Sequence, residues 1–563
     1  MKSLNFYLYR ALNNRSVSSF FQPERSMRFN WIIVLTFITN TCLMGQAFPF
    51  EMQLEPINMT GMQGIQSYTV GQHGGKWMLI GGRIDGLHRR QPFASFDQPG
   101  QNNQIIVVDP KEGKIWKASV EKLSPPLREQ LKSTNMEFYQ EAQNLILVGG
   151  YGYSDIMGDH VTFPNLTVVD IPATIQAVIE NRLTDQFFRQ VRDTFFQITG
   201  GRLDKINNSY YLTGGQKFMG RYNPMGPTHG PGFVQEYTNS LKKFDLIDDG
   251  TLIRITNVSR WTDKTAFHRR DYNVVAQIMP DGSEGLTAFS GVFQETADLP
   301  YLNSVNITEQ KYEIVPGFAQ YFNHYHCATI PLYSERNNEM HTLFFGGIAQ
   351  YYEKNGQLVQ DNNVPFVKTI ARITRSADGK MVEYKLPIEL PEWLGASSEI
   401  IQEANLPKFK NNVVKLDELN SDTTLLGYLV GGIRSNAANI FWDNEGDLST
   451  AMNTMFKVKL IKINTGSNDF KNEQSCNQLQ LQILPNPNEG QFVLSYFLAE
   501  PSDIQITITT ENGKLIHEKK LVNQNSGKHL YKSEFPQLKK SGVYFVRIKS
   551  NDIEATQKAI VSP

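Results

Sequence analysis

The sequence predicts an all-β chain in which a β-propeller is followed by a small β-sandwich. A short apolar strand that runs into a small-Gly or Gly-Gly pair recurs six times between about residues 60 and 470. The last 85 or so residues carry short alternating strands separated by turn signals. The 563 residues leave room for both parts, and 42 glycines, 34 phenylalanines and 23 tyrosines are typical of a β-rich chain with many turns.

Composition and charge exclude several classes of protein. Hydrophobic residues make up 40% of the chain, which is enough for a large core and excludes wholesale disorder. Lys+Arg is 55 and Asp+Glu is 56, so the net charge of -1 gives no support to a nucleic-acid binder. Only 3 cysteines are present, which excludes a disulfide scaffold.

The N-terminal segment, residues 1–47, is typical of a secretory signal peptide. Trp31–Ile38 is an apolar run, Arg25 and Arg28 precede it, and Gly45–Ala47 follows with small residues. The run is too short to span a bilayer, which takes about 20 residues; the alternative is a buried helix. Met27 is an alternative start of the chain, from which the signal has a more ordinary length.

The repeat occupies residues 48–464. In each unit an apolar strand ends in a glycine pair, a variable loop follows, and a second apolar strand often ends in Asp. The strands with their glycines are Trp77–Gly82, Leu145–Gly150, Tyr210–Gly215, Leu286–Gly291, Thr342–Gly347 and Gly427–Gly432. The second strands are Ile105–Asp109, Leu166–Asp170, Leu241–Asp245, Ile370–Ile373 and Phe456–Leu460. A small sheet cannot bury both faces alone, so such units are expected to stack radially.

The glycine pairs are expected near the crowded centre, where the units converge. Glycine allows backbone angles and close approaches that a Cβ atom would block. The structural glycines predicted in this way are Gly81, Gly82, Gly149, Gly150, Gly214, Gly215, Gly291, Gly346, Gly347, Gly431 and Gly432. The alternative is a pair of β-sandwiches in which the pairs are unrelated turns.

On these residues the body resembles the kelch family, whose repeat carries an apolar strand ending in Gly-Gly and a later Tyr/Trp signature. The Gly-Gly element is present in five of the six units, while the Tyr/Trp signature is weak, with Trp116 after Asp109 as its best instance. The resemblance implies a six-bladed propeller. A seventh blade follows if Gly200-Gly201 belongs to another unit, although Phe196–Gly201 fits better on the first strand of the third blade, with Tyr210 and Tyr211 on the next strand after a turn at Asn207-Asn208.

After a linker at residues 465–478, residues 479–563 form a separate module. Leu484-Pro485-Asn486-Pro487, Asn512-Gly513-Lys514 and Ser541–Val546 occur in the order of the type A sorting domain of the type IX secretion system of Bacteroidetes, which the module resembles. The resemblance implies a small β-sandwich that engages the secretion machinery and directs the protein from the periplasm to the surface or the medium. An ordinary adhesive sandwich is the alternative.

Arginines that follow glycine pairs are candidate ligand-binding residues. Arg83 and Arg202 each follow a Gly-Gly, and Arg434 lies two residues after one. At equivalent positions around an axis, guanidinium groups can bind a carboxylate or a sugar acid. Salt bridges between neighbouring blades are the alternative interpretation.

Two polar groupings complete the candidate site. His324 and His326 point the same way on a strand and can reach one metal, but no third ligand is marked by spacing, so no metal or cofactor is predicted. His268 and Arg269 belong to the polar group His268-Arg269-Arg270-Asp271. Tyr151, Tyr153, Tyr351, Tyr352 and Trp442 are loop aromatics that can stack on sugars or simply pack. No phosphate-binding loop or nucleophile elbow is present in the sequence.

The sequence favours a binding module over an enzyme. We expect a secreted or surface propeller that binds a protein or glycan through its loops, with no nucleic-acid partner and no membrane span in the mature chain. The alternative is a carbohydrate-active enzyme of the sialic-acid epimerase or galactose oxidase type, for which Cys327 beside Tyr325 is the only mature propeller cysteine. A purely structural surface-layer component is the third possibility.

Overall fold

The computed structural model describes residues 48–226, 230, 232–355 and 357–463 of the body. In the C-terminal part it describes residues 479, 481–484, 488, 491–498, 501–510, 513–525, 527–534, 541–550 and 553–561. The predicted signal peptide and linker lie outside these residues. The body and the C-terminal part are treated separately below.

Among its described residues, the body contains six large sheets, each built on four antiparallel strands that follow one another across the sheet. Sheet 1 is β2 (Thr69–His73), β3 (Lys76–Ile80), β4 (Gln104–Asp109) and β5 (Lys114–Ser119). Sheet 2 is β6 (Thr134–Glu141), β7 (Asn144–Ser154), β9 (Asn165–Asp170) and β10 (Phe188–Arg192). Sheet 3 is β11 (Arg202–Ile206), β12 (Ser209–Thr213), β15 (Ser240–Asp248) and β16 (Ile253–Thr262).

Sheet 4 is β17 (Asn273–Ile278), β18 (Glu284–Phe289), β19 (Ser304–Ile307) and β20 (Tyr312–Ile314). Sheet 5 is β21 (Ala328–Ser334), β22 (Glu339–Phe345), β25 (Thr369–Arg375) and β26 (Met381–Glu389). Sheet 6 is β28 (Glu399–Gln402), β30 (Thr423–Val430), β33 (Met455–Lys462) and β1 (Phe50–Ile57). The five predicted strand pairs are the second and third strands of their sheets, and the single strand predicted for the fourth unit is the second strand of sheet 4. Gly200-Gly201 was predicted on the first strand of the third blade, but it lies just before that strand, β11, which begins at Arg202.

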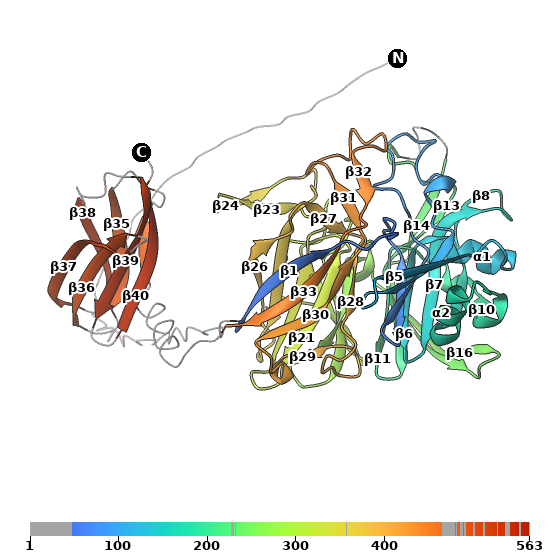
Figure 1. Ribbon diagram of the computed structural model, residues 1–563, viewed down its shortest axis with the longest axis horizontal. Coiled ribbons are helices and arrows are strands. Elements are labelled where there is room, and N and C mark those ends of the chain that lie inside the picture. Colours follow the sequence, from blue (N-terminus) through green and yellow to red (C-terminus); the bar gives the residue numbers. More distant parts are fainter. Residues whose placement is uncertain are drawn as a thin grey trace, which may run out of the picture. The chain divides into compact units, whose positions relative to one another are not determined.

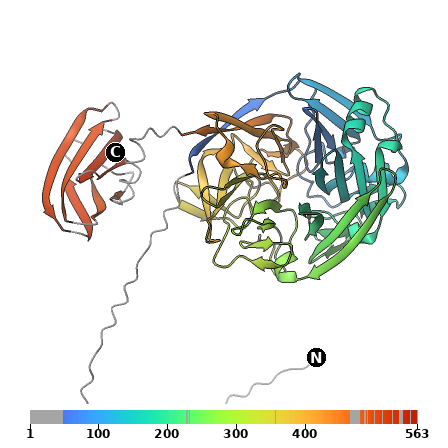
Figure 2. The same cartoon turned by 90° about the horizontal axis from the view of Figure 1, so that it is seen from below.

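The sheets follow one another in chain order around a common centre, which we call the sheet ring (Figures 1 and 2). Their first strands, β2, β6, β11, β17, β21 and β28, contact one another in this order and lie innermost. The ring closes because β1 pairs with β33, from Phe50 opposite Lys462 to Ile57 opposite Met455. The first strand of the body therefore completes the last sheet, which protects its edge.

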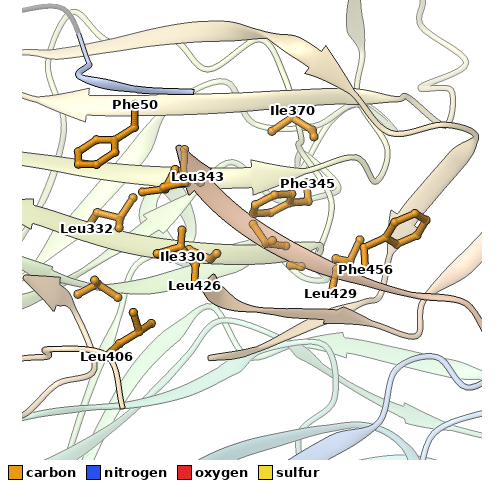
Figure 3. Close-up of a cluster of buried hydrophobic side chains, with 14 of the residues drawn as sticks. Phe50, Ile330, Leu332, Leu343, Phe345, Ile370, Leu406, Leu426, Leu429 and Phe456 are labelled. Carbon is orange, nitrogen blue, oxygen red and sulfur yellow. The ribbon is translucent and has the colours of Figure 1, made fainter. Parts of the chain in front are cut away.

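Apolar side chains fill the space between neighbouring sheets. Phe50 from β1, Phe456 from β33 and Leu343 from β22 belong to one buried cluster between sheets 5 and 6 (Figure 3). The second strands of the sheets, such as β3, β12 and β22, are almost fully buried because each sheet is covered on both faces by its neighbours.

The glycine pairs join each sheet to the next. The N–H of the second glycine, at the end of the second strand, donates to a carbonyl just before the inner strand of the following sheet. The six bonds are Gly82 to Ser133 (2.9 Å), Gly150 to Ile198 (2.9 Å), Gly215 to Arg269 (2.8 Å), Gly291 to His324 (3.2 Å), Gly347 to Leu394 (2.9 Å) and Gly432 to Ile65 (2.8 Å). The first residue of each pair has a positive φ, and in sheet 4 that residue is Ser290 (φ 50°).

A second circle of bonds surrounds the axis itself, one residue per sheet. Each backbone N–H donates to the carbonyl of the preceding sheet's equivalent residue: Asn135 to Ser67 (3.1 Å), Ser67 to Ser397 (3.1 Å), Ser397 to His326 (2.8 Å), His326 to Asp271 (2.8 Å) and Asp271 to Gly200 (2.7 Å). The sixth step is made by the Thr199 hydroxyl, which donates to the Asn135 carbonyl at 3.1 Å. These residues lie where the inner strands begin, so their neighbours in sequence meet at the axis.

Loops between the strands carry the remaining elements. β8 (Asp159–Thr162), β13 (Gln216–Met219) and β14 (Val234–Tyr237) extend sheet 2; β29 (Val414–Lys415) joins sheet 5; β23 (Tyr351–Lys354) pairs with β24 (Gln357–Gln360); and β27 (Trp393–Ala396), β31 (Ile433–Ser435) and β32 (Ser449–Ala451) form a further sheet. The helices are α1 (Pro125–Leu131), α2 (Ile171–Ile179), α3 (Lys264–Phe267), η1 (Gln98–Gly100), η2 (Asp185–Phe187), η3 (Thr194–Phe196) and η4 (Leu416–Glu418).

The C-terminal part consists of two antiparallel sheets. One is β34 (Gln482–Leu484), β35 (Gln491–Leu498) and β38 (Gly527–Glu534); the other is β37 (Leu515–Gln524), β36 (Ser502–Thr510), β39 (Gly542–Ser550) and β40 (Ile553–Val561). Their alternating apolar residues share one buried cluster, to which Leu494 of the first sheet and Ile506 and Val546 of the second belong. No helix among the described residues is long and apolar enough to cross a membrane.

Candidate functional site

A charged cluster closes the centre of the sheet ring. Arg202 Nη1 lies 3.2 Å from His326 Nε2 and 3.3 Å from Glu399 Oε1. His326 Nε2 lies 2.9 Å from the same Glu399 oxygen. Glu137 completes the cluster, and its Oε1 accepts a 2.8 Å hydrogen bond from the Gly201 N–H. We call Glu137, Arg202, His326 and Glu399 the axial cluster; they come from sheets 2, 3, 5 and 6.

The two carboxyl groups of the axial cluster have opposite pKa shifts. Burial raises the pKa of Glu137 to about 8, against the opposing effects of Arg202 and the Gly201 N–H. Burial also opposes the charge of Glu399, but Arg202 and His326 outweigh it and bring its pKa below the ordinary value. Glu137 is therefore protonated at neutral pH while Glu399 is ionised.

Cavities lie on both sides of the axial cluster. One, of about 470 Å³, follows the inner strands away from the cluster and includes Arg202 and Glu399 in its lining. A small polar space of about 20 Å³ lies at the cluster itself, large enough for one water molecule.

The third cavity, of about 590 Å³, lies on the loop side of the cluster, and we call it the loop cavity. It shares Asn135 and Asp271 with the space at the cluster. Aromatic rings and amides dominate its lining: Phe96, Tyr151, Phe218, Tyr222, Phe233, Phe293, Tyr325, Phe441 and Trp442, with Gln216, Asn223, Gln235, Asn362 and Asn363. This mixture of apolar faces and neutral hydrogen-bonding groups is typical of a small-molecule site.

Trp442 and Arg270 mark the outer and inner parts of the loop cavity. The Trp442 side chain is 62% exposed, and the Arg90 guanidinium lies 4.2 Å from the centre of its ring. Arg270 is buried near the axis, with its Nε 3.7 Å from Asp271 Oδ2. The cavity therefore leads from an exposed aromatic face to a buried cation.

The structure separates the predicted arginines. Arg202 belongs to the axial cluster, whereas Arg83 donates from Nε to Asp85 Oδ1 at 2.7 Å within its own loop. Arg434 lies 2.8 Å from Glu392 Oε2, on β31. Neither Arg83 nor Arg434 lines any of the three cavities in the described part of the chain. Arg202 differs because its glycine pair precedes an inner strand rather than ending a second strand.

The predicted histidine pair is also divided. His326 joins the axial cluster, while His324 is fully buried, with Nε2 2.9 Å from the Gln320 carbonyl and Nδ1 accepting from the Gln350 N–H at 3.0 Å. Burial lowers the pKa of His324 to about 4. The described residues contain no group of three or more His, Cys, Asp or Glu side chains arranged to hold a metal ion.

The polar group at residues 268–271 is divided in the same way. His268 stacks on Tyr237 with ring centres 3.9 Å apart, and Arg269 is fully buried, donating to the Ser290 carbonyl at 2.6 Å. Both support packing. Arg270 and Asp271, which follow them, face the loop cavity.

Sequence reasoning did not single out Glu137 or Glu399, and it named Arg270 and Asp271 only as members of the polar group with His268 and Arg269. Glu399 begins β28, Arg270 and Asp271 lie just before β17, and Glu137 lies within β6. Their position in the repeat was the one clue to these residues, because the segment that leads into each first strand lies at the axis. No residue type repeats in these segments, so the sequence did not mark them. Cys327 is buried with its Sγ 3.6 Å from Asn273 Nδ2, and burial raises its pKa to about 12.

No curated protein matches the chain. Among solved structures, one titled "Structure of YjhT" resembles it at 13% identity with a TM-score of 0.35, covering 57% of this chain and 84% of that one. Another, titled "Novel fungal alcohol oxidase with catalytic diversity among the AA5 family, in complex with copper", resembles it at 8% identity with a TM-score of 0.37, covering 92% and 100%.

The C-terminal part has a match of its own. Residues 482–562 match the family described as "Secretion system C-terminal sorting domain". This match confirms the type IX sorting domain that the sequence motifs predicted, and it indicates export followed by secretion or attachment at the cell surface.

Proposed function

We propose that the body is a six-bladed, kelch-type β-propeller that acts after export as a non-catalytic glycan-binding module. The observation that carries this proposal is the loop cavity, whose volume of about 590 Å³ falls in the usual range for small ligands. The two circles of hydrogen bonds support a six-blade count, since each circle passes once through each of the six sheets. The C-terminal two-sheet part is the small β-sandwich that hands the chain to the secretion machinery.

A glycan fits the loop cavity better than a protein surface does. Sugar rings present apolar faces that stack on aromatic side chains, and their hydroxyl groups pair with amides. Trp442 offers such a face, since its ring is exposed and Arg90 covers one side of it. Asn223, Asn362 and Asn363 line the same cavity with groups that both donate and accept.

Glycan binding by the loop cavity is tested with the Trp442→Ala variant. A glycan array on the purified body first identifies a bound saccharide, and its affinity is then measured by calorimetry. Losing one stacking face should weaken binding about tenfold. The matched control is Trp261→Ala, which removes a 37% exposed tryptophan from β16, the outer strand of sheet 3.

Equal binding by wild type and Trp442→Ala, or loss of binding only in Trp261→Ala, would contradict the assignment. Self-association without any bound saccharide would instead favour the structural surface-layer reading.

One observation favours a carbohydrate-active enzyme as a second candidate. Glu137 and Glu399 flank Arg202 with opposite pKa shifts, an arrangement that can supply an acid and a base at the same pH. Conversion of the bound saccharide during the binding experiment, removed by Glu399→Gln without loss of affinity, would establish this candidate in place of the first.

A further inference from the structure

Arg270 is a buried cation whose Nε lacks a hydrogen-bonding partner among the residues that the structure describes. The residue as a whole is 8% exposed. The nearest carboxylate oxygen, Asp271 Oδ2, lies 3.7 Å from Nε, too far for a hydrogen bond. Buried polar groups are nearly always satisfied, so a guanidinium that faces a cavity with an unsatisfied nitrogen points to a missing partner.

Aromatic rings hold this guanidinium in place at the inner part of the loop cavity. Arg270 Cζ lies 4.9 Å from the centre of the Phe293 ring and 6.0 Å from that of Phe218. Both rings line the cavity together with Arg270. The backbone is fixed separately, because Arg270 N–H donates to the Val292 carbonyl at 2.7 Å and its carbonyl accepts from the Val292 N–H at 3.0 Å. The side chain is therefore positioned in advance of any ligand.

The other ionisable groups of the cavity leave Arg270 available. His88 and His324 carry no charge at neutral pH, because burial lowers the pKa of each to about 4. Arg90 is engaged on the Trp442 ring at the outer part. Asp271 is the nearest acidic group, and burial raises its pKa despite Arg270 and His326; Asp298 also lines the cavity.

From this geometry we infer that the saccharide taken by the loop cavity is acidic and that Arg270 binds its carboxylate. A guanidinium presents a planar fork that matches a carboxylate, and the pairing is strongest where water is excluded. That the ligand is a saccharide rests on the proposed function. That the site binds an anion rests on Arg270 alone. The aromatic outer part would hold the rings, and the buried cation would select the charge.

The test compares a tetragalacturonic acid with its methyl-esterified, neutral counterpart, and uses benzoate as a carboxylate probe without a sugar. Calorimetry is performed on wild type, Arg270→Gln, Arg270→Lys and the control Arg90→Gln, which removes the same charge from the outer part. Wild type should prefer the acid at least tenfold, since a hydrogen bond to a charged group is worth about that factor. Arg270→Gln should abolish the preference, Arg270→Lys should keep part of it, and Arg90→Gln should keep most of it.

The outcomes separate the two proposals. Equal affinity for acid and ester, with both lost in Trp442→Ala, overturns the acidic ligand and leaves glycan binding intact. Benzoate binding that depends on Arg270, without binding of either saccharide, supports the anion site and overturns glycan binding. A preference lost in Arg90→Gln but kept in Arg270→Gln overturns the assignment to Arg270. Circular dichroism and thermal unfolding of each variant establish that it is folded, and Arg270→Lys provides the comparison if Arg270→Gln does not fold.

Discussion

At the scale of single residues, the centre of the sheet ring combines a buried ion pair, Arg202 with Glu399, and a buried acid that stays neutral, Glu137. Arg202 Nη1 lies 3.3 Å from Glu399 Oε1, and the negative charge of Glu399 compensates the burial of the guanidinium. Glu137 lies in the same cluster, accepts a hydrogen bond from the Gly201 N–H, and remains protonated at neutral pH. A buried ion pair costs several kcal/mol in desolvation unless the geometry is good, so a cluster in which one acid stays neutral limits that cost.

The stability of the body should therefore depend on pH through Glu137. Its pKa is raised from an ordinary 4.5 to about 8, so its contribution is fully present below pH 4.5 and is lost as the pH rises through 8. Glu137→Gln removes this ionisation. The difference in free energy of unfolding, variant minus wild type, should therefore be roughly 3–5 kcal/mol more positive at pH 9 than at pH 4. Urea unfolding of both proteins between pH 4 and 9 measures the difference, with the exposed Glu313→Gln as control.

A difference between wild type and Glu137→Gln that stays constant over this range would show that Glu137 titrates normally in the folded protein. Comparing the two proteins at each pH cancels the contribution of a buried acid that does not interact with Glu137, such as Glu383.

At the scale of elements, the glycine pairs explain how six similar sheets stay in register. Each pair ends a second strand, adopts positive φ, and donates to the loop before the next inner strand. Gly149 shows why a side chain is excluded, since a Cβ atom there would lie 1.9 Å from the Ile198 carbonyl oxygen. Ser290 shows that the φ requirement alone is tolerated where the space allows.

Gly149→Ala should destabilise the body through collision with sheet 3 as well as through backbone strain. The matched control is Gly158→Ala, because Gly158 has a similar φ of 71°, compared with 65° for Gly149, but nothing within 4 Å of its added Cβ. The control should cost about 1–2 kcal/mol from the left-handed backbone, and Gly149→Ala should cost at least about 2 kcal/mol more, as overpacking does. Urea unfolding of the two variants provides the comparison; equal losses would mean that the close approach to Ile198 contributes nothing.

At the scale of the whole molecule, the parts that the sequence predicted are those encoded locally. A strand and its glycine pair, such as Leu145–Gly150, lie within six consecutive residues, so the repeat was visible. Ring closure was not visible in the sequence, because Phe50–Ile57 carries no glycine pair and its partner strand, Met455–Lys462, lies at the other end of the body in sequence. The axial cluster was only partly found, since Arg202 and Glu399 are 197 residues apart and no spacing relates them.

The same distinction separates the two functional parts of the chain. Motifs such as Asn512-Gly513-Lys514 are contiguous, and the matched family confirms what they predicted. The loop cavity instead collects residues from loops between 87 and 442, so its chemistry follows from the fold and not from any one segment.

Removal of residues 479–563 should separate folding from export. The apolar clusters of the sheet ring contain no residue from that segment, and the cluster of the C-terminal part contains none from the ring. The truncated protein should therefore keep the thermal unfolding temperature of the body and still bind through its loop cavity. Because the sorting domain indicates export, however, it should accumulate in the periplasm, as measured by fractionation and immunoblotting against the full chain. In the complementary experiment, residues 465–563 are attached to a periplasmic reporter protein, which should then reach the surface or the medium. Two results would refute the assignment of export to the C-terminal part: truncated body in the medium at the level of the full chain, or a reporter that stays in the periplasm.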